Sequence, residues 1–300
     1  MTARVSFAAR ARGPAVAIGW IAAFAVAGAA AGYGFTLVPL RLVIDFDVDP
    51  RWALAWSALP WAAGFALATW LVGRVLDHRS WEELGWRPRP GLPLALLGGT
   101  ALGAAMAACA VGLAVLAGRA AITLTPDAGE WSAAALPLAA GLLVAALAEE
   151  LAFRGYPIRR LAGATGPVVA TALTALAFGL LHLGNPGATA FSTVNVALAG
   201  VWLGAALFSP GAMPLAWGAH FGWNATLALG FAAPVSGYAF PLPALAYRPG
   251  AHAWIDGGAF GPEGGVVSTL VMLGGTAALV AWTGGGGGGR ASRAREEAAP

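Results

Sequence analysis

The sequence predicts an all-α membrane protein, a polytopic bundle of about eight transmembrane helices. Three observations lead to this fold class. The 300 residues are 58% hydrophobic and only 10% charged, with a mean hydropathy of +0.71, whereas soluble domains carry about 25% charged residues. The apolar residues form runs of the length that a spanning helix needs, about 20 residues. Arginines gather at alternate ends of these runs.

The apolar runs define eight expected spans in chain order. The first follows an arginine-rich start and is longer than the apolar core of a secretory signal peptide, about 7–15 residues. The fifth and sixth are separated by the helix-breaking stretch "GNPGATA". The expected spans cover residues 14–39, 52–75, 91–117, 132–158, 165–183, 191–208, 212–232 and 265–283.

These spans suggest a division of the chain. We expect residues 1–13 to be a cytoplasmic segment and 14–130 to hold the first three helices. Residues 131–232 form a core of helices four to seven, and 233–283 an extracytoplasmic loop with helix eight. The glycine-rich tail, 284–300, is expected to be disordered.

Charge predicts the orientation in the membrane. Arginines flank alternate sides of the spans, at positions 4, 10 and 12, then 74, 79, 87 and 89, then 159 and 160, then 290, 293 and 295. Because arginine favours the cytoplasmic side, both termini are expected in the cytoplasm, with the chain in the cell membrane. The isoelectric point of about 9.6 rests on few charges, so the expected partner is the lipid bilayer and not nucleic acid. All 17 basic residues are arginine, which predicts a GC-rich bacterial genome.

Among the acids and histidines, four fall well inside the expected spans: Glu149, Glu150, His182 and His220. Each costs about 2.5–3.5 kcal/mol on membrane-insertion scales, so such residues are functional candidates. They come from three spans, and the seventh span adds the amide of Asn224.

Helical spacing assigns these residues to faces. Glu150 and Arg154 are four residues apart and are expected to pair, whereas Glu149 is turned about 100° away and is the freer carboxylate. His220 and Asn224 share a face in the same way, as do Phe178 and His182.

A free carboxylate with imidazole and amide donors suits hydrolysis, because the carboxylate takes a proton from water and the donors stabilise an oxyanion. Other interpretations stay open. Glu150 and Arg154 suit a structural clamp, and the whole set suits a proton or cation pathway. No cofactor is expected, although Glu149, His182 and His220 are also a possible zinc ligand set. The single cysteine excludes a cysteine-cluster metal site.

The stretches "EELAFRG", "FGLLH" and "HFGWN" together resemble the three motifs of the CPBP family, the CAAX-protease and bacteriocin-processing (Abi) intramembrane glutamate endopeptidases. The resemblance covers about residues 131–232. It implies that a peptide or membrane protein is the substrate and that Glu149 activates water. His182 would position the water or Glu149, and His220 and Asn224 would stabilise the oxyanion. It also implies structural roles for Glu150 and Arg154, and packing beside the site for Phe178.

The alternative function is a non-catalytic scaffold or an ion-coupled carrier, because some relatives in that family act as scaffolds.

The depths of two site residues in the bilayer differ. Counting about 1.5 Å of rise per residue, Glu149 lies roughly 16 Å into the bilayer and His182 roughly 28 Å. A shared site therefore requires tilted helices, and we expect the two side chains within about 6 Å of each other, the reach of a water-bridged contact.

Overall fold

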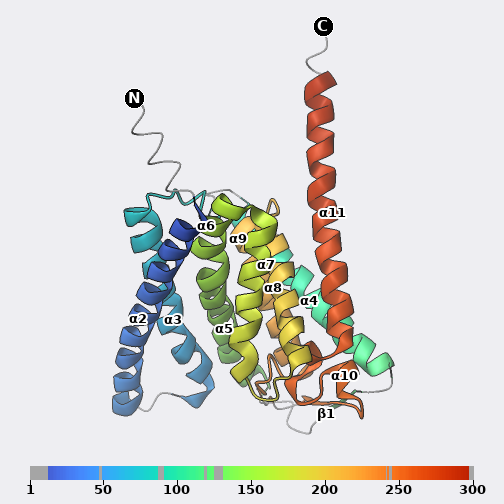
Figure 1. The fold of residues 1–300 in the computed structure, drawn as a ribbon. Coiled ribbons are helices and arrows are strands. Elements are labelled where there is room, and N and C mark those ends of the chain that lie inside the picture. Colours follow the sequence, from blue (N-terminus) through green and yellow to red (C-terminus); the bar gives the residue numbers. More distant parts are fainter. Residues whose placement is uncertain are drawn as a thin grey trace, which may run out of the picture.

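The computed structural model describes residues 13–46, 49–86, 91–117, 120–124, 131–240, 242 and 245–296. Most of the expected cytoplasmic segment 1–13 lies outside these residues, as do the arginines at positions 4, 10, 12, 87 and 89. The described residues form an upright bundle of helices (Figure 1). The expected fold class, a polytopic helical membrane protein, is confirmed.

The helices are joined by connections of very different length, and the connection between α9 and α11 is a long one. In chain order they are α2 (Pro14–Phe46), α3 (Ala53–Ala68), α4 (Leu92–Leu116), α5 (Trp131–Glu150), α6 (Tyr156–Thr165), α7 (Pro167–Leu181), α8 (Ala190–Phe208), α9 (Ala212–Ala225), α10 (Ala253–Asp256) and α11 (Val266–Glu296). π-Helical segments follow α3, α5 and α9, at Thr69–Leu76, Leu151–Gly155 and Thr226–Gly230, and the 3₁₀ turns are Pro50–Trp52, His182–Gly184, Gly258–Phe260 and Pro262–Gly264.

Local sequence explains where several helices begin. Proline occupies the first or second position of α4, α6 and α7, where its missing N–H costs no helical hydrogen bond. Thr189 and Ser192 form a reciprocal capping box at the start of α8. Helix α8 therefore begins at the last residue of the "GNPGATA" stretch, directly after its capping Thr189.

Seven helical segments in the described part of the chain are long and apolar enough to cross a membrane. They correspond to seven of the eight expected spans, and the fourth is longer than expected, Trp131–Thr165. The remaining expected span, 212–232, is helical over Ala212–Gly230 but is not among the seven. It carries His220 and Asn224, which make it less apolar, and most residues of α9 are buried inside the bundle.

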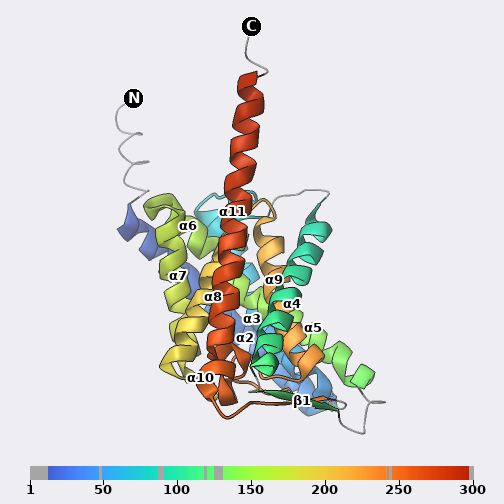
Figure 2. The same ribbon diagram turned by 90° about the vertical axis from the view of Figure 1, so that its right-hand side faces the viewer.

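Helix α9 packs closely along α4 (Figure 2), because glycines remove the side chains between them. Gly99 and Gly103 on α4 and Gly218 and Gly222 on α9 all lie against backbone of the facing helix. Such small-residue contacts let membrane helices approach each other closely. A hydrogen bond from Trp217 Nε1 to the Leu143 carbonyl, 2.9 Å, also ties α9 to α5.

This packing predicts opposite effects for two adjacent glycines. A Cβ on Gly99 would lie under 3.0 Å from Leu215 and Ala219 backbone atoms, whereas a Cβ on Gly98 meets nothing within 4 Å. We expect Gly99→Ala to destabilise the protein by about 1–3 kcal/mol through overpacking. Gly98→Ala, the matched control, should leave stability equal or higher, because alanine is the better helix former. Thermal unfolding in detergent measures both, and equal midpoints for the two variants would contradict this account.

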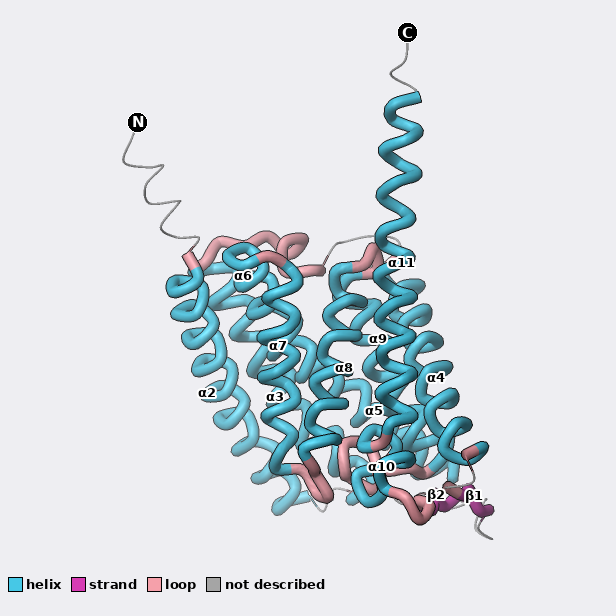
Figure 3. Tube along the Cα trace, turned by 45° about the vertical axis from the view of Figure 1, so that its right-hand side comes forward, coloured by secondary structure: helices cyan, strands magenta, loops and turns pink. Residues whose placement is uncertain are grey.

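Loops gather at the two ends of the bundle (Figure 3). At the end opposite the first residues of α2, the connection between α9 and α11 folds back against the helices. It contributes β2 (Leu245–Arg248), which pairs antiparallel with β1 (Ala121–Leu124), Ala121 lying opposite Arg248. We call the described residues of 231–265 the cap segment.

Helix α11 continues past the expected last span and extends beyond the bundle to Glu296 (Figure 1). The backbone over 284–296 is helical, and residues 297–300 lie outside the described part. The expected division of the chain into segments stays a prediction. In space, α4 packs against α9 although the division separates them.

Candidate active site

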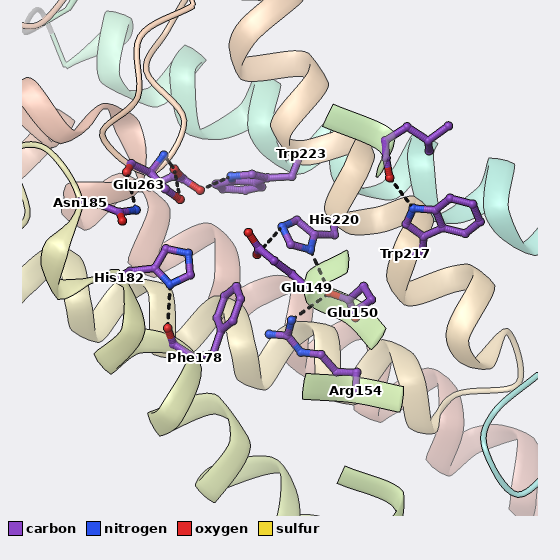
Figure 4. A network of polar contacts seen from close by, with 12 residues as sticks. Glu149, Glu150, Arg154, Phe178, His182, Asn185, Trp217, His220, Trp223 and Glu263 are labelled. Carbon is purple, nitrogen blue, oxygen red and sulfur yellow. Dashed lines mark hydrogen bonds and ion pairs between the residues drawn. The ribbon is translucent and has the colours of Figure 1, made fainter. Parts of the chain in front are cut away.

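A cavity of about 570 Å³ lies within the bundle and reaches the cap segment. Its walls come from α3, α5, α7, α8, α9, α11 and the cap segment. Five of the predicted site residues line it: Glu149, Phe178, His182, His220 and Asn224. The structure therefore brings these residues to one cavity from three separate helical segments. Figure 4 shows Glu149, Phe178, His182 and His220 close to one another.

The predicted pairing of Glu150 with Arg154 is confirmed. Arg154 Nη1 lies 2.9 Å from Glu150 Oε1, and both side chains are buried, at 1% and 0% exposed. The Arg154 guanidinium also stacks on the Phe178 ring at 4.1 Å from its centroid. Because each charge is withdrawn from water, each depends on its partner.

His220 contacts both glutamates, which helical spacing alone did not predict. Its Nδ1 lies 2.9 Å from Glu150 Oε1 and its Nε2 lies 3.6 Å from Glu149 Oε2. A carboxylate oxygen accepts, so Nδ1–H donates to Glu150 and turns Nε2 toward Glu149. Glu150 is thus more than a partner of Arg154, because it also orients the histidine of α9.

Glu149 is the more accessible of the two carboxylates. Its side chain is 39% exposed and lines the cavity, whereas that of Glu150 is fully buried. The different environments agree with the predicted difference between a free and a held glutamate. The two residues end α5 just before the π-helical segment Leu151–Gly155, and such segments are frequent at functional sites.

His182 begins the turn that ends α7 and faces the same cavity. Its Nδ1 lies 2.7 Å from the Phe178 carbonyl oxygen. Because a carbonyl oxygen only accepts, Nδ1 carries the proton of this hydrogen bond. Phe178 contacts both imidazoles, with ring centroids 4.6 Å from His182 and 6.2 Å from His220. The expected 6 Å approach of His182 to Glu149 stays a prediction.

The structure adds a residue that sequence reasoning placed in an outer loop. Glu263 of the cap segment is buried and lines the cavity. Burial raises the pKa of its carboxyl, and hydrogen bonds from Ser236 and Trp223 act in the opposite direction. Helical spacing did not predict this residue as part of the site, because it belongs to a loop that folds back against the bundle.

Residues 131–226 match the family model described as type II CAAX prenyl endopeptidase Rce1-like. Over these residues the chain is similar to the Rce1-like family. No curated protein and no solved structure matches the chain. The match confirms the resemblance to CAAX-type proteases and, at the level of the family, implies a membrane-embedded protease.

The Rce1-like segment contains every predicted site residue, from Glu149 to Asn224, whereas the cap segment and Glu263 follow it. Within the described residues, no three histidine, cysteine, aspartate or glutamate side chains come together as a metal-binding group. The zinc alternative with Glu149, His182 and His220 as ligands stays a prediction.

Proposed function

We propose that this protein is an intramembrane endopeptidase of the CAAX type that hydrolyses a peptide bond with a glutamate-activated water. The observation that carries the proposal is the position of His220 between two glutamates, one exposed in the cavity and one buried against Arg154. A free carboxylate beside a fixed hydrogen-bond donor suits attack of water on a carbonyl.

In the proposed reaction, the Glu149 carboxylate takes a proton from a water molecule, and the resulting hydroxide adds to the peptide carbonyl carbon. The lone pair on His182 Nε2 is suited to accept a hydrogen bond from that water and so orient it. When the C–N bond breaks, protonated Glu149 returns its proton to the leaving nitrogen, so the products are a new carboxyl terminus and an amine.

The oxyanion needs donors that are fixed before the reaction. The Asn224 amide lies one helical turn from His220 on α9 and lines the same cavity. His220 is flanked by two carboxylates. As an imidazolium it would donate a hydrogen bond from Nε2 to the oxyanion while its Nδ1–H remains hydrogen-bonded to Glu150. Glu150, Arg154 and Phe178 hold this arrangement in place.

The apolar walls of the cavity suit a peptide or a membrane-protein segment as substrate. They include side chains of α3, α5, α8 and α11: Leu54, Leu142, Leu203 and Met272. Apolar walls with a few placed polar groups are typical of binding sites.

The direct test is cleavage of a peptide library by the purified protein, with products identified by mass spectrometry. We expect cleavage that a metal chelator leaves unchanged. Cleavage that stops with chelator and returns with zinc would support the metal-dependent alternative. Absence of cleavage for every peptide, in protein that is folded and inserted, would support the scaffold or carrier alternative.

A further inference from the structure

Glu263 is a third carboxylate at the wall of the proposed site. It is 5% exposed, and it comes from the short 3₁₀ turn Pro262–Gly264 immediately before α11. A buried carboxylate is costly unless hydrogen bonds satisfy it. The hydrogen-bond partners of Glu263 therefore indicate why a carboxylate stands at this position.

Both oxygens of Glu263 accept hydrogen bonds from groups that only donate. Trp223 Nε1 lies 2.9 Å from Oε1 (Figure 4). The Ser236 main-chain N–H donates to Oε2. The Ser236 hydroxyl lies 3.2 Å from Oε2 as well. An indole N–H and a main-chain N–H cannot accept a hydrogen bond. Both side-chain oxygens of residue 263 must therefore be acceptors, as they are in a carboxylate.

The same residue connects three parts of the structure. Its side chain binds α9 through Trp223 and the cap segment through Ser236. Its main-chain carbonyl accepts a hydrogen bond from Asn195 Nδ2 of α8, 2.8 Å. Thr269 of α11 donates to Asn195 Oδ1 at 2.7 Å and so fixes the orientation of that amide.

Trp223 lies at the point of α9 where this connection affects the proposed chemistry. It follows His220 by three residues and directly precedes Asn224, and all three line the cavity. Residues at this spacing lie on neighbouring faces of one helix. A hydrogen bond that holds the Trp223 indole thus also limits rotation of the His220–Asn224 face.

We propose that Glu263 is a positioning residue of the proposed peptidase site, holding the His220–Asn224 face of α9 and the cap segment in register around the bound peptide. This role rests on the proposed function. It acts through Trp223 and Ser236, and it involves no contact with the reacting atoms.

The test is a double-mutant cycle on a peptide that the wild type cleaves. Glu263→Gln replaces an acceptor oxygen by an NH₂ group, and Trp223→Phe removes the indole N–H. We expect each to lower kcat by about 10- to 100-fold, the cost of small misplacement of catalytic groups, with KM nearly unchanged. The double variant should be no slower than the slower single variant, since both remove one connection.

Asp256→Asn is the matched control. Asp256 is another buried acid of the cap segment, bonded to the Gly250 and Gly258 N–H groups, and it does not line the cavity. It should leave kcat near the wild-type value under conditions where all variants are folded. Where Glu263→Gln yields no folded protein, Trp223→Phe carries the same expectation.

Three results would overturn the role of Glu263: unchanged kcat in both single variants, an equal loss in Asp256→Asn, or losses that multiply in the double variant. A wild type that cleaves no peptide would instead overturn the proposed function, and this role with it. The two failures are therefore distinguishable by the wild type alone.

Discussion

Glu149→Gln is expected to reduce kcat/KM for peptide cleavage by about 10²–10⁴-fold, the usual contribution of general acid–base catalysis. Glutamine keeps the size of the side chain but cannot take a proton from water or return it to the leaving nitrogen. The folded protein should be unaffected, because the Glu149 side chain is 39% exposed in the cavity. The measurement is initial rate against peptide concentration for purified variants of equal thermal midpoint.

Glu82→Gln is the control for this prediction. Glu82 is exposed in the turn before α4 and does not line the cavity, so the variant should cleave at the wild-type rate. A Glu149→Gln variant that retains most of the wild-type kcat/KM would rule out Glu149 as the base. His182, His220 and Glu263, which also line the cavity, would then be candidates for that role.

Arg154→Met is expected to destabilise the protein by about 3–5 kcal/mol, the usual cost of leaving a buried charge without its partner. The substitution leaves the fully buried Glu150 carboxylate with His220 Nδ1 as its described partner. It also removes the guanidinium from the face of Phe178. Thermal or denaturant unfolding in detergent, followed by a probe of helix content, measures the loss.

The combination Glu150→Leu with Arg154→Met should be less destabilised than the sum of its two single variants, because it removes both buried charges together. Arg248→Met, on an exposed position of β2, should change stability by at most about 0.5 kcal/mol. An Arg154→Met protein that unfolds like the wild type would show that the ion pair is dispensable for the fold.

Much of the fold follows from the sequence because membrane helices are determined locally. Length, hydropathy and the "GNPGATA" breaker place seven spans close to where the structure has them. The segment 212–232 is the informative difference. Its polar His220 and Asn224 are tolerated because neighbouring helices surround α9, and that depends on the glycines that let α4 approach.

The candidate site, too, was predicted from the sequence only in part. Spacing of four residues predicted the Glu150–Arg154 pair and a freer Glu149, since side chains one turn apart meet on any helix. Depth counted along separate helices did not place His182 with Glu149. A depth counted along one helix contains no information about how that helix is tilted. The regular α-helical rise also ends after Glu150, where the π-helical segment Leu151–Gly155 begins.

The sequence by itself determined the membrane class and the helical segments, and it singled out the candidate site residues Glu149, His182, His220 and Asn224. These features depend on composition and on short periodic spacing. Only the tertiary structure decided that His220 bridges both glutamates and that Glu263 returns from a distant loop to hold Trp223. Contacts between residues 70 and 40 positions apart depend on how helices cross and how a loop folds back. Those are properties of the packed molecule, and local patterns of residues do not encode them.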